Sequence, residues 1–488
     1  MSLFSNSPKP SRLFPVKFSP STKILSPIPE STDQLPPVPE ESPVKLFPFP
    51  NSPMKVKALA DISNLHAVTP NLSLRKKPTT IHHSNTISSS LGKTRLTSYP
   101  KFSMENLKPG AEFIVKHFDL PMAGTRVMSL YRHFLTPNEV VEIRKYETVY
   151  YFGHKAKKLP EGYTDRNGVY KAIAFDHLGY RYEVLEMIGQ GTFGHVYKCF
   201  DHKHQQLVAV KIIRRNTNTR KQGENEVKTL ETLNEQDPDL NNLVRLLQCF
   251  EFRGHLCITY ELLSLNLYQF LKKNDFKGLN LNLIKRIASQ ILRALKYIHG
   301  FGLFHCDLKL ENILLKSESK TSIKVIDFGS AIGNSNPLFT YLQSRYYRAP
   351  EVILGCGYDE KIDIWSFGCV LVELYTGQAL FPGENERDQL LKIVKVIGEP
   401  PIKVLERSMR KNVFFSDGRE RLGVKCGLGD IIKPKDKEEG IFEDFIKKIL
   451  VWEAKERPSA EEALKHAWIR GGLKESPSIS KGRLLFNS

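Results

Sequence analysis

Cysteine is scarce in this chain of 488 residues, which has seven cysteines, all at or after Cys199 and none in a Cys-x-x-Cys pair. This distribution argues against a disulfide framework and a cysteine-based metal site, and it is typical of reduced thiols inside the cell. No stretch approaches the roughly 18 apolar residues of a membrane helix. The first residues, MSLFSNSPKPSRLF, also lack the apolar segment of a signal peptide. We therefore expect a soluble protein without a membrane segment, located in the cytoplasm, the nucleus or both.

Acidic residues are outnumbered, because 71 Lys and Arg residues face 53 Asp and Glu residues and give a net charge of +18. Such an excess indicates either nucleic-acid binding or acidic and phosphorylated protein partners. We favour protein partners over nucleic acid, since the sequence has no compact basic stripe interleaved with aromatic residues. The triplet Arg75-Lys76-Lys77 is a weak nuclear-import signal.

Hydrophobic periodicity is absent from residues 1–112, which hold more than half of the chain's 29 prolines. Such a segment cannot bury enough apolar surface to offset chain entropy, so we predict that it is disordered. Its stretches LFPVKFSP and LFPFPNSP are either a repeated docking or phosphorylation element for a partner or a coincidence of biased composition. Proline follows Ser7, Ser19, Ser26, Ser42, Ser52 and Thr69.

The composition becomes globular from about residue 115. The β-branched and aromatic residues of ETVYYF, at 147–152, predict a strand. Residues 182–264 indicate a β-rich unit with one helix, and residues 265–470 indicate a mostly helical unit. One predicted helix has an apolar face and a cap at Gly300. The face consists of Ile284, Ile287, Ala288, Ile291, Leu295 and Ile298. We therefore predict an α+β fold of two lobes, with a nucleotide-binding cleft between them.

Gly189, Gly191 and Gly194 form a Gly-x-Gly-x-x-Gly pattern, which is weak evidence on its own. The surrounding segment is strand-like on both sides, whereas a dinucleotide-binding loop leads from a strand into a helix. The pattern therefore favours a hairpin that closes over phosphates, where glycine lets the backbone approach phosphate oxygens. Next, the apolar strand VAVK ends at Lys211, and Glu226 follows in a helical pattern. Lys211 can contact phosphates and pair with Glu226, although each alone would be read as an ordinary surface charge.

The motif His-Cys-Asp-Leu-Lys-Leu-Glu-Asn occupies residues 305–312, Asp-Phe-Gly residues 327–329, and Ala-Pro-Glu residues 349–351. Together with the glycine pattern and Lys211, these motifs form the protein-kinase signature in its usual order. The sequence therefore predicts the bilobal protein kinase fold and an enzyme that uses ATP and Mg²⁺.

Phosphoryl transfer depends mainly on positioning and on charge neutralisation, and this assigns a role to each residue. Asp307 is predicted to orient the acceptor hydroxyl and take its proton, and Lys309 to neutralise the transferring phosphate. Asn312 and Asp327 are the predicted Mg²⁺ ligands. The predicted adenine contacts are Ile188, Val196, Ala209, Leu314 and Ile326 around the ring, and the backbone of Glu261 and Leu263 at its edge.

Several segments resemble the dual-specificity tyrosine-regulated kinases, the DYRK family of the CMGC group. They are His-Cys-Asp in place of the common His-Arg-Asp, FTYLQSRYYRAPEVILG, LTPNEVVEIRKYETVYYFGHKAKK and AFDHLGYRYEVL. The last two are similar to the accessory region and the Asp-His box, here Asp176 and His177, of that family's second class. The resemblance implies an accessory region needed for autophosphorylation at 113–181, a kinase domain at 182–469 and a flexible tail at 470–488.

The resemblance also implies autophosphorylation on Tyr341, at the second position of a Tyr-x-Tyr pair whose first position is Phe339 here. A packed aromatic residue is the alternative for Tyr341. Cys306 replaces the arginine that commonly binds an activation-loop phosphate. We therefore predict that Arg345 and Arg348 bind the phosphotyrosine.

Kinases of the CMGC group generally prefer proline after the acceptor, so the resemblance implies Ser/Thr-Pro substrates, often with an arginine a few residues earlier. Arg348 matches an arginine near the proline pocket. Glu311 and Glu386 are the predicted partners of the substrate arginine, unless they are merely solvated. Tyr260 stands at the gatekeeper position, where the family usually has phenylalanine, and we expect ATP binding to survive.

Further matches complete the kinase frame. Asp363, Trp365 and Gly368 match the helix that anchors the catalytic loop, and Arg457 matches the arginine that pairs with Glu351. Because every catalytic position is filled, we favour an active enzyme over an inactive scaffold that acts by binding alone. We expect a monomer.

Overall fold

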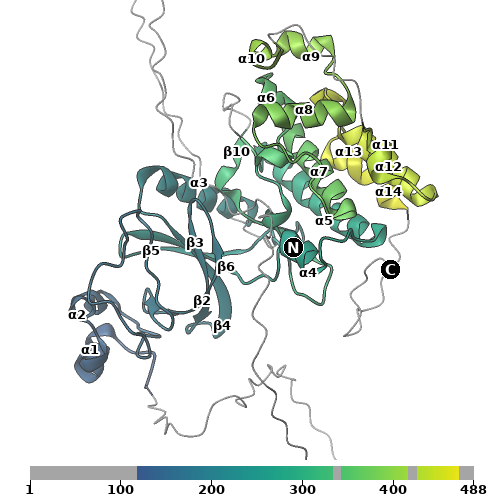
Figure 1. The fold of residues 1–488 in the computed structure, drawn as a ribbon. Coiled ribbons are helices and arrows are strands. Elements are labelled where there is room, and N and C mark those ends of the chain that lie inside the picture. The colour runs from purple at the N-terminus through teal and green to yellow at the C-terminus, as the bar shows by residue number, and fades with distance from the viewer. Residues whose placement is uncertain (1–117, 334–341, 416–425, 472–488) are drawn as a thin grey trace, which may run out of the picture. The chain divides into compact units, whose positions relative to one another are not determined.

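The computed structural model describes residues 118–333, 342–415 and 426–471 (Figure 1). These residues all belong to one compact unit, residues 108–488. The Ser-Pro sites, the two similar stretches and Tyr341 lie outside the described residues. Within the described ranges, no helix has the length and apolar character needed to span a bilayer.

A six-stranded antiparallel sheet in the order β1-β2-β3-β4-β6-β5 forms the small lobe, together with one helix, α3. The strands are His177–Leu178 (β1), Tyr182–Gln190 (β2), Gly194–Asp201 (β3), Gln206–Ile213 (β4), Leu246–Phe252 (β5) and His255–Glu261 (β6), and α3 is Thr217–Leu233. The predicted β-rich unit with one helix is confirmed.

Strand β4 shows how this sheet positions a functional side chain. Val208 and Val210 pack into one apolar cluster, whereas Ala209 and Ile213 pack into the main core that includes residues of α3. Because side chains of a strand alternate between its faces, Lys211 points to the same side as Ala209 and Ile213. The lysine is thereby directed toward α3.

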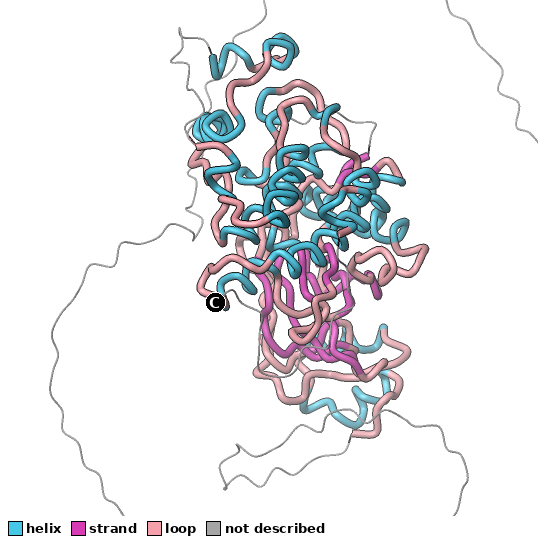
Figure 2. Tube along the Cα trace, turned by 90° about the vertical axis from the view of Figure 1, so that its right-hand side faces the viewer, coloured by secondary structure: helices cyan, strands magenta, loops and turns pink. Residues whose placement is uncertain are grey.

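The large lobe is mostly helical, as predicted, and Figure 2 shows its helices apart from the strands of the sheet. Its helices are Leu267–Lys273 (α4), Leu281–Gly300 (α5), Pro350–Leu354 (α6), Lys361–Thr376 (α7), Glu386–Ile397 (α8), Ile402–Arg407 (α9), Lys411–Phe415 (α10), Leu428–Ile432 (α11), Lys437–Ile449 (α12), Ala460–Lys465 (α13) and Ala467–Arg470 (α14). A two-stranded sheet pairs Leu303–Phe304 (β7) with Ile332–Gly333 (β10), and a hairpin between them in the chain pairs Ile313–Leu315 (β8) with Ile323–Val325 (β9).

Helix α5 confirms the predicted apolar face, since all six of its predicted residues are fully buried. Asn280 caps its beginning, where the side chain accepts a hydrogen bond from the Leu283 N–H. The predicted cap at Gly300 is wrong. Gly300 is the last helical residue, Phe301 follows as the cap, and the left-handed φ of 66° falls at Gly302, which glycine adopts readily.

The described part of the accessory region contains α1 (Gly124–Tyr131) and α2 (Pro137–Glu142). The strand predicted at 147–152 is wrong, because this segment has only one isolated bridge, between Val149 and Met122. Its backbone instead donates hydrogen bonds to the Tyr180 carbonyl. Phe152 is buried in an aromatic cluster, stacked on Tyr131 with ring centroids 5.6 Å apart. Aromatic packing, which favours the same residue types as a strand, organises this segment.

Candidate active site

A lysine of the sheet lies between two carboxylates. The Lys211 ammonium on β4 lies 2.8 Å from Oε2 of Glu226 on α3, and 3.0 Å from Oδ1 of Asp327. Lys211 and Glu226 are both buried. Burial disfavours the ammonium, but the carboxylates of Asp327 and Glu226 outweigh this effect and raise the pKa of Lys211. The structure thus brings three of the predicted site residues together and keeps the lysine charged.

The Asp307 carboxylate accepts hydrogen bonds from three side chains. Lys309 Nζ lies 2.6 Å and Asn312 Nδ2 lies 3.1 Å from its Oδ2, and the Ser344 hydroxyl lies 2.7 Å from its Oδ1. Lys309 also donates to Ser344 Oγ at 3.1 Å. These contacts hold Asp307 in one orientation. Sequence analysis missed Ser344, whose only signal is its place in the activation segment, five residues before Ala349.

The two predicted metal ligands come from neighbouring ends of one hairpin. Asn312 precedes β8 and Asp327 follows β9, and the Ile326 N–H donates to the Asn312 carbonyl at 2.9 Å. Burial raises the pKa of Asp327, but Lys211 outweighs burial and lowers it, so the carboxylate is ionised. A carboxylate and an amide oxygen are the oxygen donors that a hard divalent cation prefers.

A buried aspartate anchors the catalytic loop to α7. Asp363 is fully buried and accepts hydrogen bonds from the backbone N–H groups of His305, at 2.8 Å, and Cys306, at 2.9 Å. The His299 ring lies 3.0 Å from the same carboxylate. Cys306 has a left-handed φ of 62°, and these two hydrogen bonds hold that uncommon conformation. The helix therefore fixes the backbone immediately before Asp307.

The glycine-rich hairpin joins β2 and β3, as the sequence predicts. Gly189 lies opposite Val196, and the Gly191 N–H donates to the Gly194 carbonyl at 2.9 Å. A Cβ on Gly194 would lie 2.1 Å from the Ile212 carbonyl oxygen, so only glycine fits there. The hairpin therefore stays close to β4, which carries Lys211.

The end of β6 and the segment after it contain the backbone groups predicted to bind the edge of adenine. The Glu261 N–H already donates to the Arg245 carbonyl at 3.1 Å, and the Glu261 carboxylate contacts the Arg245 N–H and the Lys324 ammonium. The Glu261 carbonyl and the Leu263 backbone remain as candidates for adenine. The predicted ring contacts range from buried Ala209 to exposed Ile188, with Val196, Leu314 and Ile326 in between.

The two arginines predicted to bind phosphotyrosine contact other groups in this structure. Arg345 Nη1 donates to the Glu384 carbonyl at 2.6 Å. Arg348 is buried, and its guanidinium lies 2.9 Å from the Glu386 carboxylate and 3.0 Å from the Gln343 carbonyl. Both lie shortly after Tyr341 in the chain, but Tyr341 is outside the described residues. Phosphotyrosine binding therefore stays a prediction.

The two carboxylates predicted to meet a substrate arginine differ. Glu386 contacts Arg348 and also Arg410, whose Nη2 lies 2.7 Å away, so its charge is already compensated and it is not supported in that role. Glu311 has a buried oxygen, Oε2, without a hydrogen-bond partner among the described residues. Burial and the neighbouring Glu311 raise the pKa of Glu373 to about 7, although a hydrogen bond from Tyr347 opposes them. Glu311 and Glu373 are therefore neighbouring acidic groups. Sequence analysis did not identify Glu373.

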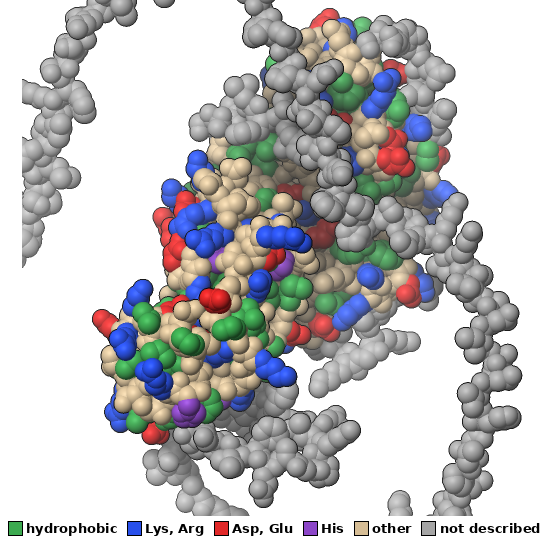
Figure 3. Space-filling view, turned by 60° about the vertical axis from the view of Figure 1, so that its left-hand side comes forward, with side chains coloured by type: hydrophobic (Ala, Val, Ile, Leu, Met, Phe, Trp, Pro, Cys, Tyr) green, Lys and Arg blue, Asp and Glu red, His purple; other side chains and the backbone are tan. Residues whose placement is uncertain are grey.

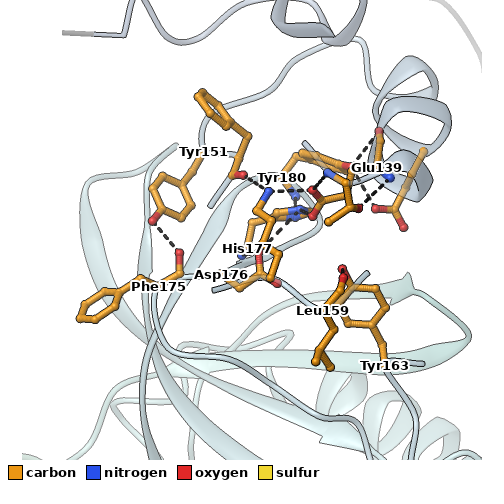
Figure 4. Close-up of polar contacts among 12 residues, drawn as sticks. Glu139, Tyr151, Leu159, Tyr163, Phe175, Asp176, His177 and Tyr180 are labelled. Atoms are coloured by element: carbon orange, nitrogen blue, oxygen red, sulfur yellow. Dashed lines mark hydrogen bonds and ion pairs between the residues drawn. The ribbon is translucent and has the colours of Figure 1, made fainter. Parts of the chain in front are cut away.

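The accessory region is tied to the sheet by a buried ionic network around Glu139 (Figure 4). Its carboxylate lies 2.7 Å from Lys158 Nζ, 2.9 Å from His177 Nε2 and 3.1 Å from Arg253 Nη2. Arg253 belongs to the β5–β6 turn of the sheet. His177 and Asp176 of the predicted Asp-His box thus lie at the junction of accessory region and small lobe. Sequence analysis missed Glu139, whose signal was the capping box that it forms with Thr136 at the start of α2.

Glu139, Asp176 and His177 have ligand atoms close enough together to suggest a metal site. Lys158 and Arg253 already bring positive charge to this group, however. A further cation would meet their repulsion, so the cluster is better explained as a structural ion network.

Comparison with known proteins agrees with the geometry of the site. Residues 182–469 match the family model described as protein kinase domain. The chain therefore belongs to the protein kinases.

Curated relatives place it within one branch. It is 41% identical over 384 residues to dual specificity tyrosine-phosphorylation-regulated kinase 3 of Rattus norvegicus, covering 72% of this chain and 66% of the relative. It is 42% identical over 368 residues to dual specificity tyrosine-phosphorylation-regulated kinase 4 of Homo sapiens, covering 71% of this chain and 70% of the relative. The mbk-2 kinase of Caenorhabditis briggsae is 42% identical over 377 residues, covering 70% and 46%. The chain is a member of the dual-specificity tyrosine-phosphorylation-regulated kinases, although it spans only about half to two thirds of several relatives. The resemblance seen in the sequence is confirmed.

Proposed function

We propose that this chain is an active dual-specificity protein kinase, which transfers the ATP γ-phosphoryl group to Ser and Thr of other proteins and to one of its own tyrosines. The observation that supports this most strongly is the set of contacts that joins Lys211 to Asp327 and Asn312 to Asp307, with Glu226 paired to the lysine and the Ile326 N–H bonded to the Asn312 carbonyl. An inactive scaffold would not need all of these groups. Family membership makes ATP and a divalent metal the expected cofactors, and Mg²⁺ is our proposal for the metal.

Each side chain then has a separate task. The Lys211 ammonium would contact the α and β phosphates, and Asn312 and Asp327 would hold Mg²⁺, whose charge would offset that of the phosphates. Asp307 would accept a hydrogen bond from the acceptor hydroxyl and take its proton, while the hydroxyl oxygen bonds to the γ-phosphorus and the bond from that phosphorus to the β–γ bridging oxygen breaks, which releases ADP. Lys309 contacts Asp307 at 2.6 Å. From that position its ammonium would neutralise negative charge on the phosphoryl group during transfer.

ATP turnover by the purified chain tests this proposal, with Asp307→Asn as the matched control. The carboxamide keeps the size of the side chain but cannot accept the proton. We expect the wild-type chain to phosphorylate a Ser-Pro peptide and the variant to lose most of that activity. Equal rates for the two proteins would refute the assignment.

We propose that Tyr341 is the autophosphorylated tyrosine and that Arg345 and Arg348 bind its phosphate. Family membership and the position of both arginines just after Tyr341 support this. Binding would require each guanidinium to exchange or share its present partners, Glu384 and Glu386. Tyr341→Phe is expected to lose most activity; a fully active Tyr341→Phe enzyme made without phosphotyrosine would contradict the idea.

We propose that substrates carry proline after the acceptor and arginine a few residues before it. Glu311 and Glu373 support the arginine preference, because two neighbouring acidic groups that form no ion pair with a cation of the described residues suit a guanidinium. A peptide array that varies both positions tests the proposal. An array with no preference for following proline would contradict it.

We propose protein partners, rather than nucleic acid, for a monomeric enzyme of the cytoplasm or nucleus. On the face drawn in Figure 3, the basic side chains of the described residues are interspersed with acidic ones, without a continuous basic stripe. The stretches LFPVKFSP and LFPFPNSP are the proposed docking elements for such partners. Binding of nucleic acid by residues 1–110 alone, with steep salt dependence, would contradict this.

A further inference from the structure

The gatekeeper tyrosine makes a contact that phenylalanine at this position cannot make. The Tyr260 hydroxyl donates a hydrogen bond of 2.7 Å to Oε1 of Glu226, while Oε2 of the same carboxylate accepts one of 2.8 Å from Lys211. Tyr260 and Glu226 are both buried. Each oxygen of the Glu226 carboxylate therefore has its own donor, Tyr260 on β6 for Oε1 and Lys211 on β4 for Oε2.

The position of Tyr260 in the sheet is itself fixed. It lies opposite Ala209 on β4 and Leu246 on β5, and it directly precedes Glu261 at the predicted adenine edge. The hydroxyl therefore connects the strand beside the adenine site to helix α3, which carries Glu226. The rest of α3 is independent of this contact, since its buried face consists of apolar residues such as Val227 and Leu230.

We propose that Tyr260 is a positioning residue for phosphoryl transfer, whose hydroxyl holds Glu226 and thereby keeps the Lys211 ammonium directed at the nucleotide phosphates. This inference rests on the proposed function, because the ammonium matters only if phosphates bind beside it. Among the described site residues, the Tyr260 hydroxyl hydrogen-bonds Glu226, so Tyr260 acts through that carboxylate.

The chemistry of the buried pair supports this role. Burial and the Glu226 carboxylate raise the pKa of Tyr260 well above its usual value, so the phenol remains a hydrogen-bond donor. Burial also raises the pKa of Glu226, an effect opposed by the charge of Lys211 and by the hydrogen bonds from Lys211 and Tyr260. Without the hydroxyl, Oε1 would be buried with no donor among the described residues. A carboxylate in that situation turns toward water or takes up a proton, and either change weakens its hold on Lys211.

The test compares two ligands, ADP with Mg²⁺ and adenosine, in the full-length chain and its Tyr260→Phe variant. Adenosine has no phosphate, so it does not report on Lys211. We expect the dissociation constant of ADP to rise about tenfold, the size expected when a hydrogen bond to a charged group is lost. Adenosine affinity should stay within about twofold, and kcat should fall with ADP affinity while the KM of the peptide substrate is unchanged.

Two further variants make the test specific. Tyr182→Phe removes another hydroxyl from the same sheet, one that donates to Gln248 at 3.1 Å outside the Glu226 network, and it should leave both affinities unchanged. In a Glu226→Ala background, Tyr260→Phe should change ADP affinity no further, because the hydroxyl has lost the group through which it acts.

Three results would overturn the inference. They are an unchanged ADP affinity in Tyr260→Phe, an equal weakening of ADP and adenosine, and a further weakening of ADP binding when Tyr260→Phe is added to Glu226→Ala. The proposed function fails separately, if the wild-type chain binds ADP but does not turn over ATP. In that case the binding comparison still decides the role of Tyr260.

Discussion

Arg253 Nη2 lies 3.1 Å from the Glu139 carboxylate, a contact between a turn of the kinase sheet and a helix of the accessory region that are 114 positions apart in the chain. The same guanidinium reaches Glu142 at 3.0 Å and stacks on the Tyr163 ring, 3.6 Å from its centroid. Arg253 thus connects the accessory region to the small lobe through both charge and aromatic packing. The accessory region is in this sense an integral part of the kinase sheet.

Glu139→Gln should therefore destabilise the protein strongly. The substitution removes the carboxylate from between three buried nitrogen groups, and breaking such a network typically costs about 3 kcal/mol or more. We expect a clearly lower midpoint of thermal unfolding and less phosphate on Tyr341. The control is Glu161→Gln, at an exposed position of the same region, which should leave the midpoint unchanged. Equal midpoints for the two variants would contradict the role of the network.

The same carboxylate predicts a pH dependence of stability. Burial raises the pKa of Glu139, but His177 and Lys158 outweigh burial and lower it far below its usual value. Because the folded-state pKa is depressed, the stabilisation is complete above the pKa of an unfolded glutamate, about 4.3. It is lost as pH falls further, toward the folded-state pKa. The gap between the unfolding midpoints of wild type and Glu139→Gln should therefore stay constant from pH 7 to about 5 and narrow as pH falls to 3, and parallel curves would be inconsistent with this assignment.

Glu373 predicts a pH-dependent preference for substrate arginine. Its pKa of about 7 means that the group gains negative charge as pH rises through that value, which strengthens attraction to a guanidinium. We expect the KM of an arginine-containing peptide to fall between pH 6 and 8, while the KM of the matching alanine peptide stays level. Glu373→Gln should abolish the difference in pH dependence. If both peptides show the same profile in wild type, Glu373 does not meet the arginine.

Ser344→Ala should lower kcat. The hydroxyl contacts both Asp307, at 2.7 Å, and Lys309, at 3.1 Å, so its loss removes one of the hydrogen bonds that hold the carboxylate that orients the acceptor. Loss of one hydrogen bond to a charged group predicts a decrease of about tenfold. The KM of ATP should change little, because Ser344 does not contact Lys211 or Asp327. Steady-state kinetics with both substrates varied measure the two effects, and a change confined to the KM of ATP would argue against this role.

Arg457 and Glu351 form a bidentate buried pair, with distances of 2.6 and 2.8 Å. Arg457→Met leaves the carboxylate buried without its partner, and we expect a loss of about 3–5 kcal/mol in the free energy of unfolding. The double variant with Glu351→Leu removes both charges and should recover most of the loss. Denaturant unfolding compares the three proteins, and a double variant as unstable as Arg457→Met would contradict the explanation.

Much of the catalytic cleft was predictable, because its residues lie in motifs whose spacing is tied to their chemistry. Lys211, Glu226, Asp307, Asn312 and Asp327 meet as their positions in the chain suggested. The accessory region was harder, since the residue types that pack around Phe152 are those that also favour a strand. Sequence patterns indicate hydrophobic periodicity and the residues at which helices begin and end. They do not predict which charged side chains, distant in the chain, will be buried together.

Glu139 and Ser344 show that limit most clearly. Each was an ordinary polar residue in the sequence, and each became functional in our account only through partners far away in the chain, Arg253 and Asp307. Tyr260 was recognised at the gatekeeper position, but its partner depends on how α3 packs on the sheet. The residues next to Tyr260 in the sequence do not indicate how closely it approaches Glu226 of α3.

Mapping of phosphate by mass spectrometry, after incubation with ATP and Mg²⁺, tests the central claim most directly. The wild-type chain and Asp307→Asn are purified alike and incubated with a Ser-Pro peptide. We predict phosphate on Tyr341 and on the peptide serine for the wild type, and on neither for the variant. Unmodified wild-type protein and peptide, or the same modification with Asp307→Asn, would contradict the assignment of this cleft as a protein kinase active site.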